Sequence, residues 1–428
     1  MRVLVVGGGG REHALCWALH RDTPDAGLFA APGNPGTATL GTNLPISATD
    51  VDALVAAVVQ HDIDVTIIGP EAPLAAGLAD KLHDAGRAVF GPSQAAARLE
   101  SSKAYAKEVM RRAGVPTGAS ATFTELPAAL EYIEAHAEPL VVKASGLAAG
   151  KGVVVCVTRA EAADVARAML AGGALGEAGS EIVVEQFLEG EELSVLALTD
   201  GERIVILPPA QDHKRLGEGD TGPNTGGMGA YCPVAVTTDE LLARVRRDVI
   251  EPVLREMAAQ GAPYEGVLYA GLMLAPDGTP NVLEFNCRFG DPEAQAILPI
   301  LPKGATKHLI DIAHRRWRTK RQVIAPSRAA VTTVLAARGY PEKPEKGAAI
   351  RLPSDLGTNV VVFQAGTSRD ADGTLRTAGG RVLSVTGLGS SVAAAARVSR
   401  AACDKIAFDG KTWRRDIAWR ELQRAGAA

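Results

Sequence analysis

A row of polar side chains lies about two-thirds of the way along the chain, in the run Asn281–Asp291. On a β-strand alternate side chains share one face, so Glu284, Asn286 and Arg288 would stand in a line about 7 Å apart. A carboxylate and a carboxamide offer the hard oxygen ligands that Mg²⁺ prefers, and substrate phosphates usually complete the set. A guanidinium beside them can hold a phosphoryl group or a carboxylate. The run predicts metal-assisted phosphoryl transfer, and the alternative is a surface strand whose polar face meets water.

A second candidate is the segment 140–155, in which a strand that carries Lys143 leads into a loop of small residues. Without bulky side chains, such a loop can lie over a polyphosphate and donate backbone N–H groups to it. It is not the P-loop pattern, because Gly146 and Gly150 are too close together and a glycine follows Lys151. The segment therefore indicates either a phosphate-binding loop or a simple hairpin.

The glycine cluster Gly7–Gly10 invites a dinucleotide-binding interpretation. That fingerprint needs a third glycine inside the motif and an acidic residue about 20 positions later. The third position holds Glu12 or His13, and the second predicted strand ends without a carboxylate. A glycine turn at a helix N-terminus can still donate backbone N–H groups to a phosphate. We therefore predict a mononucleotide or sugar-phosphate site rather than an NAD site.

Two further segments carry polar groups. The apolar strand expected at 182–186 includes Glu185, which could accept a hydrogen bond from an adenine edge, although acids at strand ends are common. The segment 211–231 mixes charges, amides and glycines, and a structureless stretch of this length in a compact domain is usually functional or disordered. We predict a binding loop there, in which His213 is either a solvated or structural imidazole or a catalytic base.

Composition excludes several classes of protein. A chain of 428 residues exceeds what one core supports, so about two to four domains are expected. A net charge of −4 with scattered basic residues argues against a nucleic-acid partner. The five cysteines are odd in number and lack a Cys-x-x-Cys pair, as expected for reduced cytosolic thiols. The sequence shows neither a signal peptide nor an apolar run of membrane length, so we predict a cytoplasmic protein.

Secondary-structure patterns place these motifs at the ends of predicted elements. In the first hundred residues, strands are expected at 3–6, 27–31, 65–68 and 89–90, and helices at 11–21, 51–60 and 74–85. Thr49 and Asp50 are capping candidates for the second helix. Buried apolar strands that alternate with helices predict a parallel, doubly wound sheet, which binds ligands at the carboxyl ends of its strands.

The rest of the chain predicts a different architecture. Asp200-Gly201 and Asp277-Gly278 each lie between apolar runs, which favours hairpins and an α+β region. The charged stretch 314–321 is interpreted as a solvated helix end and linker rather than a nucleic-acid patch. Beyond it, strands at 331–335, 360–364 and 381–386 and a helix at 390–406 predict a small C-terminal α/β domain. The predicted domains are 1–102, 103–322 with a lid subdomain at about 116–190, and 323–428.

Taken together, these segments make the sequence similar to the ATP-grasp ligases, and more narrowly to the phosphoribosylamine–glycine ligase (glycinamide ribonucleotide synthetase) family. The resemblance runs in order through 8–14, 31–34, 69–74, 146–153, 211–215, 220–231, 284–293 and 379–383. It implies an N-terminal Rossmann-like doubly wound domain, a central ATP-grasp fold with a mobile lid subdomain, and a C-terminal α/β domain. It also implies ATP and Mg²⁺ (or Mn²⁺), the substrates glycine and 5-phosphoribosylamine, de novo purine biosynthesis, and a cytoplasmic monomer without nucleic-acid or membrane partners.

The resemblance further implies roles for single residues. Arg288 and Lys214 would be catalytic and stabilise the transferring phosphoryl charge, while Glu284 and Asn286 would hold the metal. The implied ATP-binding residues are Lys103, Lys143, Gly146, Gly150, Lys151, Gly152, Glu185, Phe187, Leu188, Glu192 and Lys214. The implied substrate-binding residues are Gly9, Gly10, Asn34, Glu71, Asp212, Asn224, Thr225, Gly226, Gly227, Met228, Arg288 and Asp291. Glu185 and the backbone of 187–188 would meet adenine, Glu192 the ribose, and the 144–152 loop would close over the phosphates.

The implied chemistry is consistent with these residue types. Phosphorylation of glycine by ATP gives an acyl phosphate, which the ribosyl amine attacks, and a closing loop would exclude water from it. The phosphoryl step needs positioning and charge neutralisation more than a protein nucleophile. Two segments depart from the family pattern. Ser145 stands where Asp is common, and 298–307 lacks the Asp that usually starts a helix, which leaves that helix cap and nearby substrate contacts open.

Three alternatives remain at the level of the sequence. One is another ATP-grasp ligase that joins a different carboxylate to a different amine, and the 211–231 segment argues against it. Another is an NAD-linked oxidoreductase, which Glu12 and the missing ribose-binding acid disfavour. The last is a nucleotide-sensing module without turnover, which the polar row at 284–288 disfavours.

Overall fold

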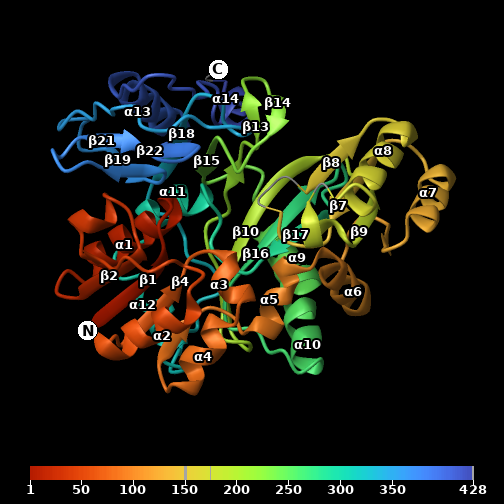
Figure 1. Cartoon of the computed structure of the whole chain (residues 1–428), viewed down its shortest axis with the longest axis horizontal. Helices are drawn as coiled ribbons and strands as arrows, with labels where there is room; N and C mark the ends of the chain where they lie inside the picture. Colours follow the sequence, from red (N-terminus) through yellow and green to blue (C-terminus); the bar gives the residue numbers. More distant parts are fainter. Residues whose placement is uncertain (149–151, 174, 427–428) are drawn as a thin grey trace.

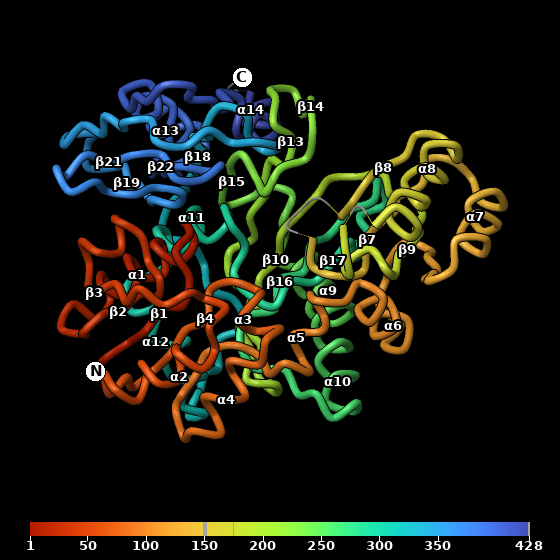
Figure 2. Tube along the Cα trace, in the orientation of Figure 1, coloured from red at the N-terminus to blue at the C-terminus, as the bar shows by residue number. Residues whose placement is uncertain are grey.

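The computed structural model describes residues 1–148, 152–173 and 175–426, which form three regions (Figure 1). The N-terminal region, drawn in red, lies below the C-terminal region, drawn in blue. The central region lies beside both and extends into an outer sheet with two helices. Figure 2 shows the same path as a tube, with the chain ending beside the hairpin that carries β13 and β14.

The N-terminal region is built on a five-stranded parallel sheet in the order β3-β2-β1-β4-β5. Its strands are β1 (Arg2–Gly7), β2 (Gly27–Pro32), β3 (Thr42–Asn43), β4 (Val65–Ile68) and β5 (Ala88–Phe90). Its helices are α1 (Gly10–Asp22), α2 (Val51–Gln60), α3 (Glu71–Ala75), α4 (Leu78–Asp84) and α5 (Gln94–Ser101). Val5 packs in one core with Leu15 of α1, and Leu4 packs in another with Leu54 of α2. Helices thus cover both faces, and the predicted doubly wound parallel sheet is confirmed.

The strand order reverses at β1, which lies between β2 and β4. The carboxyl ends of β1 and β4 lead into the glycine turn 7–10 and the segment 69–71. A crevice outside these strand ends is where doubly wound sheets bind ligands. The topology therefore brings together two of the motifs that the sequence singled out.

Local signals explain where this region matches the predictions and where it does not. Asp50 caps α2 and accepts a hydrogen bond from the backbone N of Ala53 at 3.1 Å. The helix predicted over 74–85 is instead two helices, because the chain turns at Gly77 with a φ of +81°. The two-residue strand β3 was not predicted, since it has no apolar run.

The predicted lid subdomain is an antiparallel sheet in the order β6-β9-β7-β8. Its elements are β6 (Ser120–Phe123), α7 (Leu126–Ala135), β7 (Leu140–Ala144), β8 (Val153–Cys156), α8 (Arg159–Leu170) and β9 (Ile182–Gln186). Ile133 of α7, Ala166 of α8 and Val142 of β7 share one small core. The subdomain meets the central sheet where Thr117 Oγ1 donates to the carbonyl of Val282 at 2.6 Å.

The central sheet is antiparallel, in the order β11-β10-β16-β17. Its strands are β10 (Glu191–Thr199), β11 (Ile204–Ile206), β16 (Gly266–Leu274) and β17 (Pro280–Asn286). Both predicted Asp-Gly hairpins are confirmed, since Gly201 joins β10 to β11 and Gly278 joins β16 to β17. The helices of this region are α6 (Lys103–Ala113), α9 (Asp239–Val245), a π-helical turn (Arg246–Ile250), α10 (Glu251–Ala259), α11 (Glu293–Ile297) and α12 (Lys307–Ala313).

The segment 211–231 is not the irregular loop that its length predicted. It forms β12 (Gln211–Asp212), β13 (Arg215–Gly217), β14 (Thr221–Asn224) and β15 (Gly229–Cys232). β13 pairs with β14, whereas β12 and β15 complete the C-terminal sheet, whose order is β12-β15-β18-β22-β19. Strands this short and rich in glycine show no apolar alternation, so the sequence pattern could not indicate them.

The C-terminal region is an antiparallel sheet with a long helix packed on it. Its elements are β18 (Ala329–Ala336), β19 (Val360–Gln364), β20 (Thr367–Arg369), β21 (Leu375–Thr377), β22 (Arg381–Gly389), α13 (Val392–Lys405) and α14 (Trp419–Arg424). The stretch 314–321 is not wholly solvated, since Trp317 is buried and its Nε1 donates to His308 at 2.8 Å. Within the residues described, none of the helices has the length and apolar character needed to cross a membrane.

Helix α12 begins without the expected acidic cap, and α1 supplies one instead. The carboxylate of Asp22 accepts hydrogen bonds from the backbone N and the hydroxyl of Thr306, at 3.1 and 3.0 Å. Arg21 donates to the other oxygen of Asp22 at 2.8 Å. The acidic cap that the segment 298–307 lacks is thus supplied by Asp22, a residue distant in sequence.

We predict that Asp22→Ala lowers the free energy of unfolding by about 1–2 kcal/mol, as loss of a helix cap does. Burial alone would raise the pKa of Asp22, but hydrogen bonds with Arg21, Thr306 and Gly304 outweigh burial and lower it. The stabilisation is therefore complete above about pH 3.9 and is lost as the pH falls through the lowered value. In urea unfolding, the free energies of unfolding of the wild type and Asp22→Ala should differ less at pH 3 than at pH 7. The exposed Asp25→Ala is the control, and a difference independent of pH would contradict the prediction.

Candidate active site

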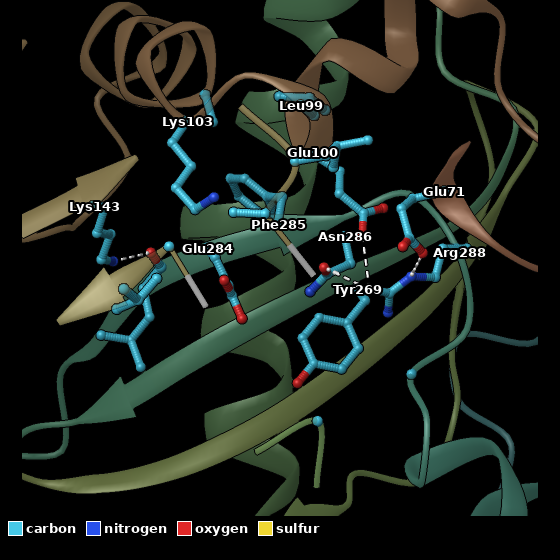
Figure 3. A pocket seen from close by; sticks show the side chains of 18 of the residues that line it. Glu71, Leu99, Glu100, Lys103, Lys143, Tyr269, Glu284, Phe285, Asn286 and Arg288 are labelled. Atoms are coloured by element: carbon cyan, nitrogen blue, oxygen red, sulfur yellow. Dashed lines mark hydrogen bonds and ion pairs between the residues drawn. The ribbon is translucent and has the colours of Figure 1, made fainter. Parts of the chain in front are cut away.

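A cavity of about 400 Å³ lies between the lid sheet and the central sheet, and residues of all three regions line it (Figure 3). Many of the predicted site residues meet there: Glu71, Lys103, Lys143, Gly152, Asp212, Lys214, Thr225, Gly226, Glu284, Asn286, Arg288 and Asp291. These residues span most of the sequence, so the fold gathers them into one polar cavity.

A bulge in β17 decides which of its side chains reach this cavity. Strict alternation would put Val282 on the same face as Glu284. In the pairing with β16, consecutive residues lie opposite Val282 and Glu284, which leaves Leu283 without a partner. The extra residue lets Val282 and Phe285 both enter the core while Glu284 faces the cavity. The carbonyl of Leu283 accepts a hydrogen bond from Nζ of Lys143 at 3.1 Å.

Arg288 lies beyond the strand on which the sequence placed it. β17 ends at Asn286, so the predicted strand row is wrong at its last member, although the guanidinium still reaches the cavity. Its Nη2 contacts Asn286 Oδ1 at 3.1 Å and Glu100 Oε1 at 2.7 Å, and its Nε donates to Glu71 at 3.3 Å (Figure 3). Burial would lower the pKa of Arg288, but the nearby carboxylates of Glu100 and Glu71 have the larger effect and raise the pKa. The guanidinium therefore stays charged.

Several carboxylates crowd around one ammonium group. Lys214 Nζ contacts Glu192 at 2.5 Å. Burial opposes the charge of Lys214, but Glu192, Asp212 and Glu284 outweigh it and hold the pKa of Lys214 well above its usual value. Burial also raises the pKa of Asp212 to about 8, and the nearby Glu293 adds to the rise while Lys214 opposes it. Lys214 therefore stays charged within a cluster of acidic side chains.

Lysines of α6 and of the lid also line the cavity. Burial lowers the pKa of Lys103, which points into the cavity from the start of α6 (Figure 3). Lys143 of β7 forms an ion pair with the buried carboxylate of Glu185, which also contacts Lys107 Nζ at 2.5 Å. Cations on both the body and the lid thus face the same space, as an anionic polyphosphate would require.

Glu284 and Asn286 suit a divalent cation. Burial would raise the pKa of Glu284, but Lys214, Lys143 and Lys103 outweigh it and lower the pKa, so the carboxylate is ionised. None of the described residues donates a hydrogen bond to it. In the described part of the chain no three His, Cys, Asp or Glu side chains form a metal cage. One carboxylate and one amide oxygen fit an ion that takes its other ligands from phosphates and water.

The crevice at the ends of β1 and β4 is occupied by Glu12. A Cβ on Gly7 would lie 2.5 Å from the Glu12 side chain, and one on Gly69 would collide with its carboxylate. The carboxylate accepts hydrogen bonds from the backbone N of Gly9 at 2.7 Å and from Arg11 at 2.6 Å. A dinucleotide fold leaves this place open for a pyrophosphate, so the structure supports the argument against an NAD site.

Asn34 holds the glycine turn in place. Its Nδ2 donates to the carbonyls of Gly8 at 3.0 Å and Gln364 at 2.8 Å. Its Oδ1 accepts from the backbone N of Gly36 at 2.7 Å and of Thr37 at 3.1 Å. Asn34 therefore joins the N-terminal and C-terminal regions beside the cavity, and a direct contact with substrate stays a prediction.

Other predicted residues do not line the cavity, and their contacts with ligands also stay predictions. They are Gly9, Gly10, Gly146, Glu185, Phe187, Leu188, Glu192, Asn224, Gly227 and Met228. Met228 is wholly buried in the hydrophobic core. The predictions for Gly150 and Lys151 lie outside the described residues.

His213 is a structural imidazole. It is buried, and its Nε2 accepts a hydrogen bond from the backbone N of Ala418 at 2.9 Å. Burial lowers its pKa, which favours the neutral ring. Asp220, in the same hairpin, pairs with Arg414 at 2.8 Å. The hairpin beside Lys214 is thus fixed to the C-terminal segment, and neither a solvated nor a cavity-facing role of His213 is confirmed.

Ser145, which departs from the family pattern, also has a defined place. Its Oγ accepts a hydrogen bond from the backbone N of Ala104 at 3.1 Å, and its carbonyl accepts from the backbone N of Lys103 at 2.9 Å. It therefore satisfies the first amides of α6 and joins the lid subdomain to the helix that carries Lys103.

Sequence reasoning missed several charged or polar residues of the cavity: Arg11, Glu100, Lys107, Tyr269, Glu293 and Arg381. Lys107 could have been found, since it follows Lys103 by four positions and shares its helix face. Glu293 and Arg381 lie in stretches already singled out, at 284–293 and 379–383. For Tyr269 the sequence offers no signal.

Three comparisons identify relatives of this chain. Models of phosphoribosylglycinamide synthetase match as an N domain at 1–100, an ATP-grasp (A) domain at 101–294 and a C domain at 330–420. The phosphoribosylamine–glycine ligase of Xanthomonas axonopodis is 45% identical over 99% of both chains. The crystal structure of phosphoribosylamine–glycine ligase from Thermotoga maritima has a TM-score of 0.86 and 36% identity, covering 98% of this chain and 100% of that one.

A more distant structure shares only the fold. The biotin carboxylase domain of 2-oxoglutarate carboxylase from Hydrogenobacter thermophilus is 17% identical, with a TM-score of 0.74, and covers 96% of this chain and 91% of that one. Two antiparallel sheets with a charged cavity between them, together with the matched domain model, define an ATP-grasp enzyme. The chain belongs to the phosphoribosylglycinamide synthetase family. The predicted family, ligase class and fold class are confirmed, while the domain boundaries and residue roles stay predictions.

We predict that Asn34→Asp lowers the free energy of unfolding by about 1–3 kcal/mol. The change would set a carboxylate oxygen against the carbonyls of Gly8 and Gln364, where a buried donor is needed. Urea unfolding measures the effect. The half-exposed Asn281→Asp serves as the control and should change stability by less than about 0.5 kcal/mol. An Asn34→Asp protein as stable as the control would contradict the structural role.

Proposed function

We propose that this chain joins glycine to 5-phosphoribosylamine with ATP, through glycyl phosphate, and forms glycinamide ribonucleotide, ADP and phosphate in de novo purine biosynthesis. The observation that carries the proposal is the 45% identity, over 99% of both chains, with a protein named phosphoribosylamine–glycine ligase. The chemistry requires activation, because a carboxylate has a poor leaving group and its charge repels an amine. A glycine carboxylate oxygen attacks the γ-phosphorus of ATP and displaces ADP, which gives glycyl phosphate. The amine then attacks the carbonyl carbon and phosphate, a good leaving group, departs with that oxygen.

The charges of the cavity suit phosphoryl transfer. Lys103 and Lys143 contact the ATP phosphates in this proposal, from the body and the lid respectively. Lys214 and Arg288 stabilise the charge that develops on the transferring group and on the glycine carboxylate. Fixed cations inside a cavity that excludes water are worth more than the same charges in solvent. Because the proposed step needs no protein nucleophile, the lysines and arginine are sufficient for this chemistry.

Glu284 and Asn286 would hold Mg²⁺, or Mn²⁺, against the phosphates. The all-oxygen donor pair favours a hard ion, which makes Mg²⁺ the expected choice. When bound, such an ion neutralises phosphate charge and polarises the phosphoryl oxygens. The ionised Glu284 already faces Lys103, Lys143 and Lys214, so the carboxylate lies where the phosphates are proposed to bind.

Apolar and polar parts of the cavity suggest where each ligand lies. Met110 of α6 and Val153 and Val183 of the lid form an apolar wall that suits a purine ring. Glu185 with the backbone of 187–188 would meet the adenine, and Glu192 the ribose. Glu71, the turn held by Asn34, and the segment 224–228 would face the phosphoribosylamine. In this proposal the γ-phosphate lies near Arg288, between glycine and the rest of the nucleotide.

We further propose that the enzyme works as a monomer in the cytoplasm. The lining of the cavity comes from all three regions of a single chain, which supports a site that is complete without a partner. All five cysteines are buried as free thiols, as expected in a reducing compartment.

The proposed function predicts that ADP release depends on both substrates. With ATP and Mg²⁺, ADP should form rapidly when glycine and phosphoribosylamine are supplied together, and slowly with either one alone. A coupled assay for ADP, together with mass spectrometry of glycinamide ribonucleotide, measures both the turnover and the product. A rate of ADP release that does not depend on glycine would refute the proposed function.

We predict that Glu284→Gln and Arg288→Met each lower kcat on the order of 100-fold. The first removes the charged ligand proposed for the metal ion, and the second removes a cation that stabilises the transferring phosphoryl group. Thermal unfolding should show that both proteins remain folded, since these side chains face the cavity. The exposed substitutions Glu240→Gln on α9 and Arg255→Met on α10 are matched controls and should leave kcat unchanged. Near-normal turnover of both cavity variants would refute the assignment of these residues.

A further inference from the structure

One carboxylate of the cavity lining has no role in the proposed reaction. Glu100 lies in the last turn of α5, and only 8% of its side chain is exposed. One oxygen contacts Arg288 Nη2 at 2.7 Å, and the other accepts a hydrogen bond from the backbone N of Cys287 at 2.7 Å. Both oxygens are thus used to hold the turn that follows β17.

The placement of Glu100 is unfavourable for the helix that carries it. A negative charge near a helix C-terminus opposes the helix dipole. Burial adds a second cost and raises the pKa of Glu100, although Arg288 counteracts the rise. A buried acid at such a position is stabilised only by its specific partners. Its contacts therefore concern the turn at 287–288 rather than the stability of α5.

The two carboxylates on Arg288 differ in what they can do. Glu71 is 35% exposed, contacts Nε at 3.3 Å and opens onto the cavity. Glu100 is nearly enclosed, closer, and bound to the backbone as well as to the guanidinium. An incoming anion can replace Glu71 on the cavity side of Arg288, whereas Glu100 cannot leave without exposing an unpaired amide. Glu100 therefore acts as the fixed support and Glu71 as the exchangeable partner.

We propose that Glu100 is a positioning residue for Arg288, which fixes both the turn after β17 and the direction of the guanidinium toward the transferring phosphoryl group. The proposal rests on the proposed function of Arg288 in that step. Glu100 acts through Arg288 in this proposal, because the Arg288 guanidinium and the backbone N of Cys287 already occupy its two carboxylate oxygens. A cation displaced by about 1 Å can cost on the order of 100-fold in rate.

The test is a double-mutant cycle on Glu100→Gln and Arg288→Met. Glutamine keeps the shape and can still accept from Cys287 but removes the charge. We expect Glu100→Gln to lower kcat on the order of 10- to 100-fold, with the affinity for Mg–ADP by titration calorimetry changed less than about twofold. Because Glu100 acts through Arg288, the double variant should be no slower than Arg288→Met alone.

Thermal unfolding supplies a readout that does not depend on the reaction. Arg288→Met leaves the buried Glu100 without its partner, so adding Glu100→Gln should raise the unfolding temperature of that variant. If the wild-type protein shows no glycine-dependent ADP release, the proposed function fails, and this arm still tests the pair. Glu108→Gln, which removes an exposed carboxylate paired with Arg111 and Arg112 on α6, is the control and should leave kcat unchanged.

Defined results would overturn the proposal. Glu100→Gln with kcat within twofold of wild type would do so, as would losses that multiply in the double variant. A loss of Mg–ADP affinity as large as the loss of kcat would indicate general damage to the cavity. If Glu100→Gln does not fold, the double variant, which lacks both buried charges, replaces it, and its comparison with Arg288→Met decides the question.

Discussion

The bulge at Leu283 is the constraint on which the active site depends. Without it, Glu284 and Val282 would compete for the same face of β17, and either a carboxylate would enter the core or a valine would face the cavity. Gly271 on β16 leaves room for the Glu284 side chain, whose Cγ would lie 3.3 Å from a Cβ there. The same bulge turns the Leu283 carbonyl toward Lys143. One inserted residue thus separates core from cavity and joins the central sheet to the lid.

Charge in the cavity is arranged in pairs that a bound ligand can rearrange. Lys214 forms an ion pair with Glu192, and Lys143 forms one with Glu185. Arg288 pairs with both Glu71 and Glu100. Such pairs keep buried charges compensated while the cavity holds no ligand. Phosphates and a divalent ion bring both signs of charge, so they can take over these partners without leaving a buried charge unpaired. In the role proposed for Glu100, Glu71 is the partner of Arg288 that can leave, and Glu100 is the partner that stays.

The C-terminal region completes the site rather than merely covering it. Arg381 of β22 donates to the carbonyls of Gly226 at 2.5 Å and Asp291 at 2.7 Å, and Tyr340 accepts from the backbone N of Gly226 at 3.0 Å. Strands from the 211–231 segment lie in the same sheet as β18 and β22. This side of the cavity is therefore shaped by parts of the chain that are separated by 90 to 155 residues.

The family, the doubly wound N-terminal sheet, both Asp-Gly hairpins and most of the charged residues of the cavity could be predicted from the amino-acid sequence. These follow from local apolar periodicity, turn residues and long ordered motifs, which the chain displays before it folds. Four features became visible only in the folded chain: the bulge at Leu283, the position of Arg288 beyond β17, the strands within 211–231, and the capping of α12 by Asp22. Each of these depends on a partner distant in sequence, and backbone pairing or a hydrogen bond across such distances leaves no periodic trace in the residues themselves.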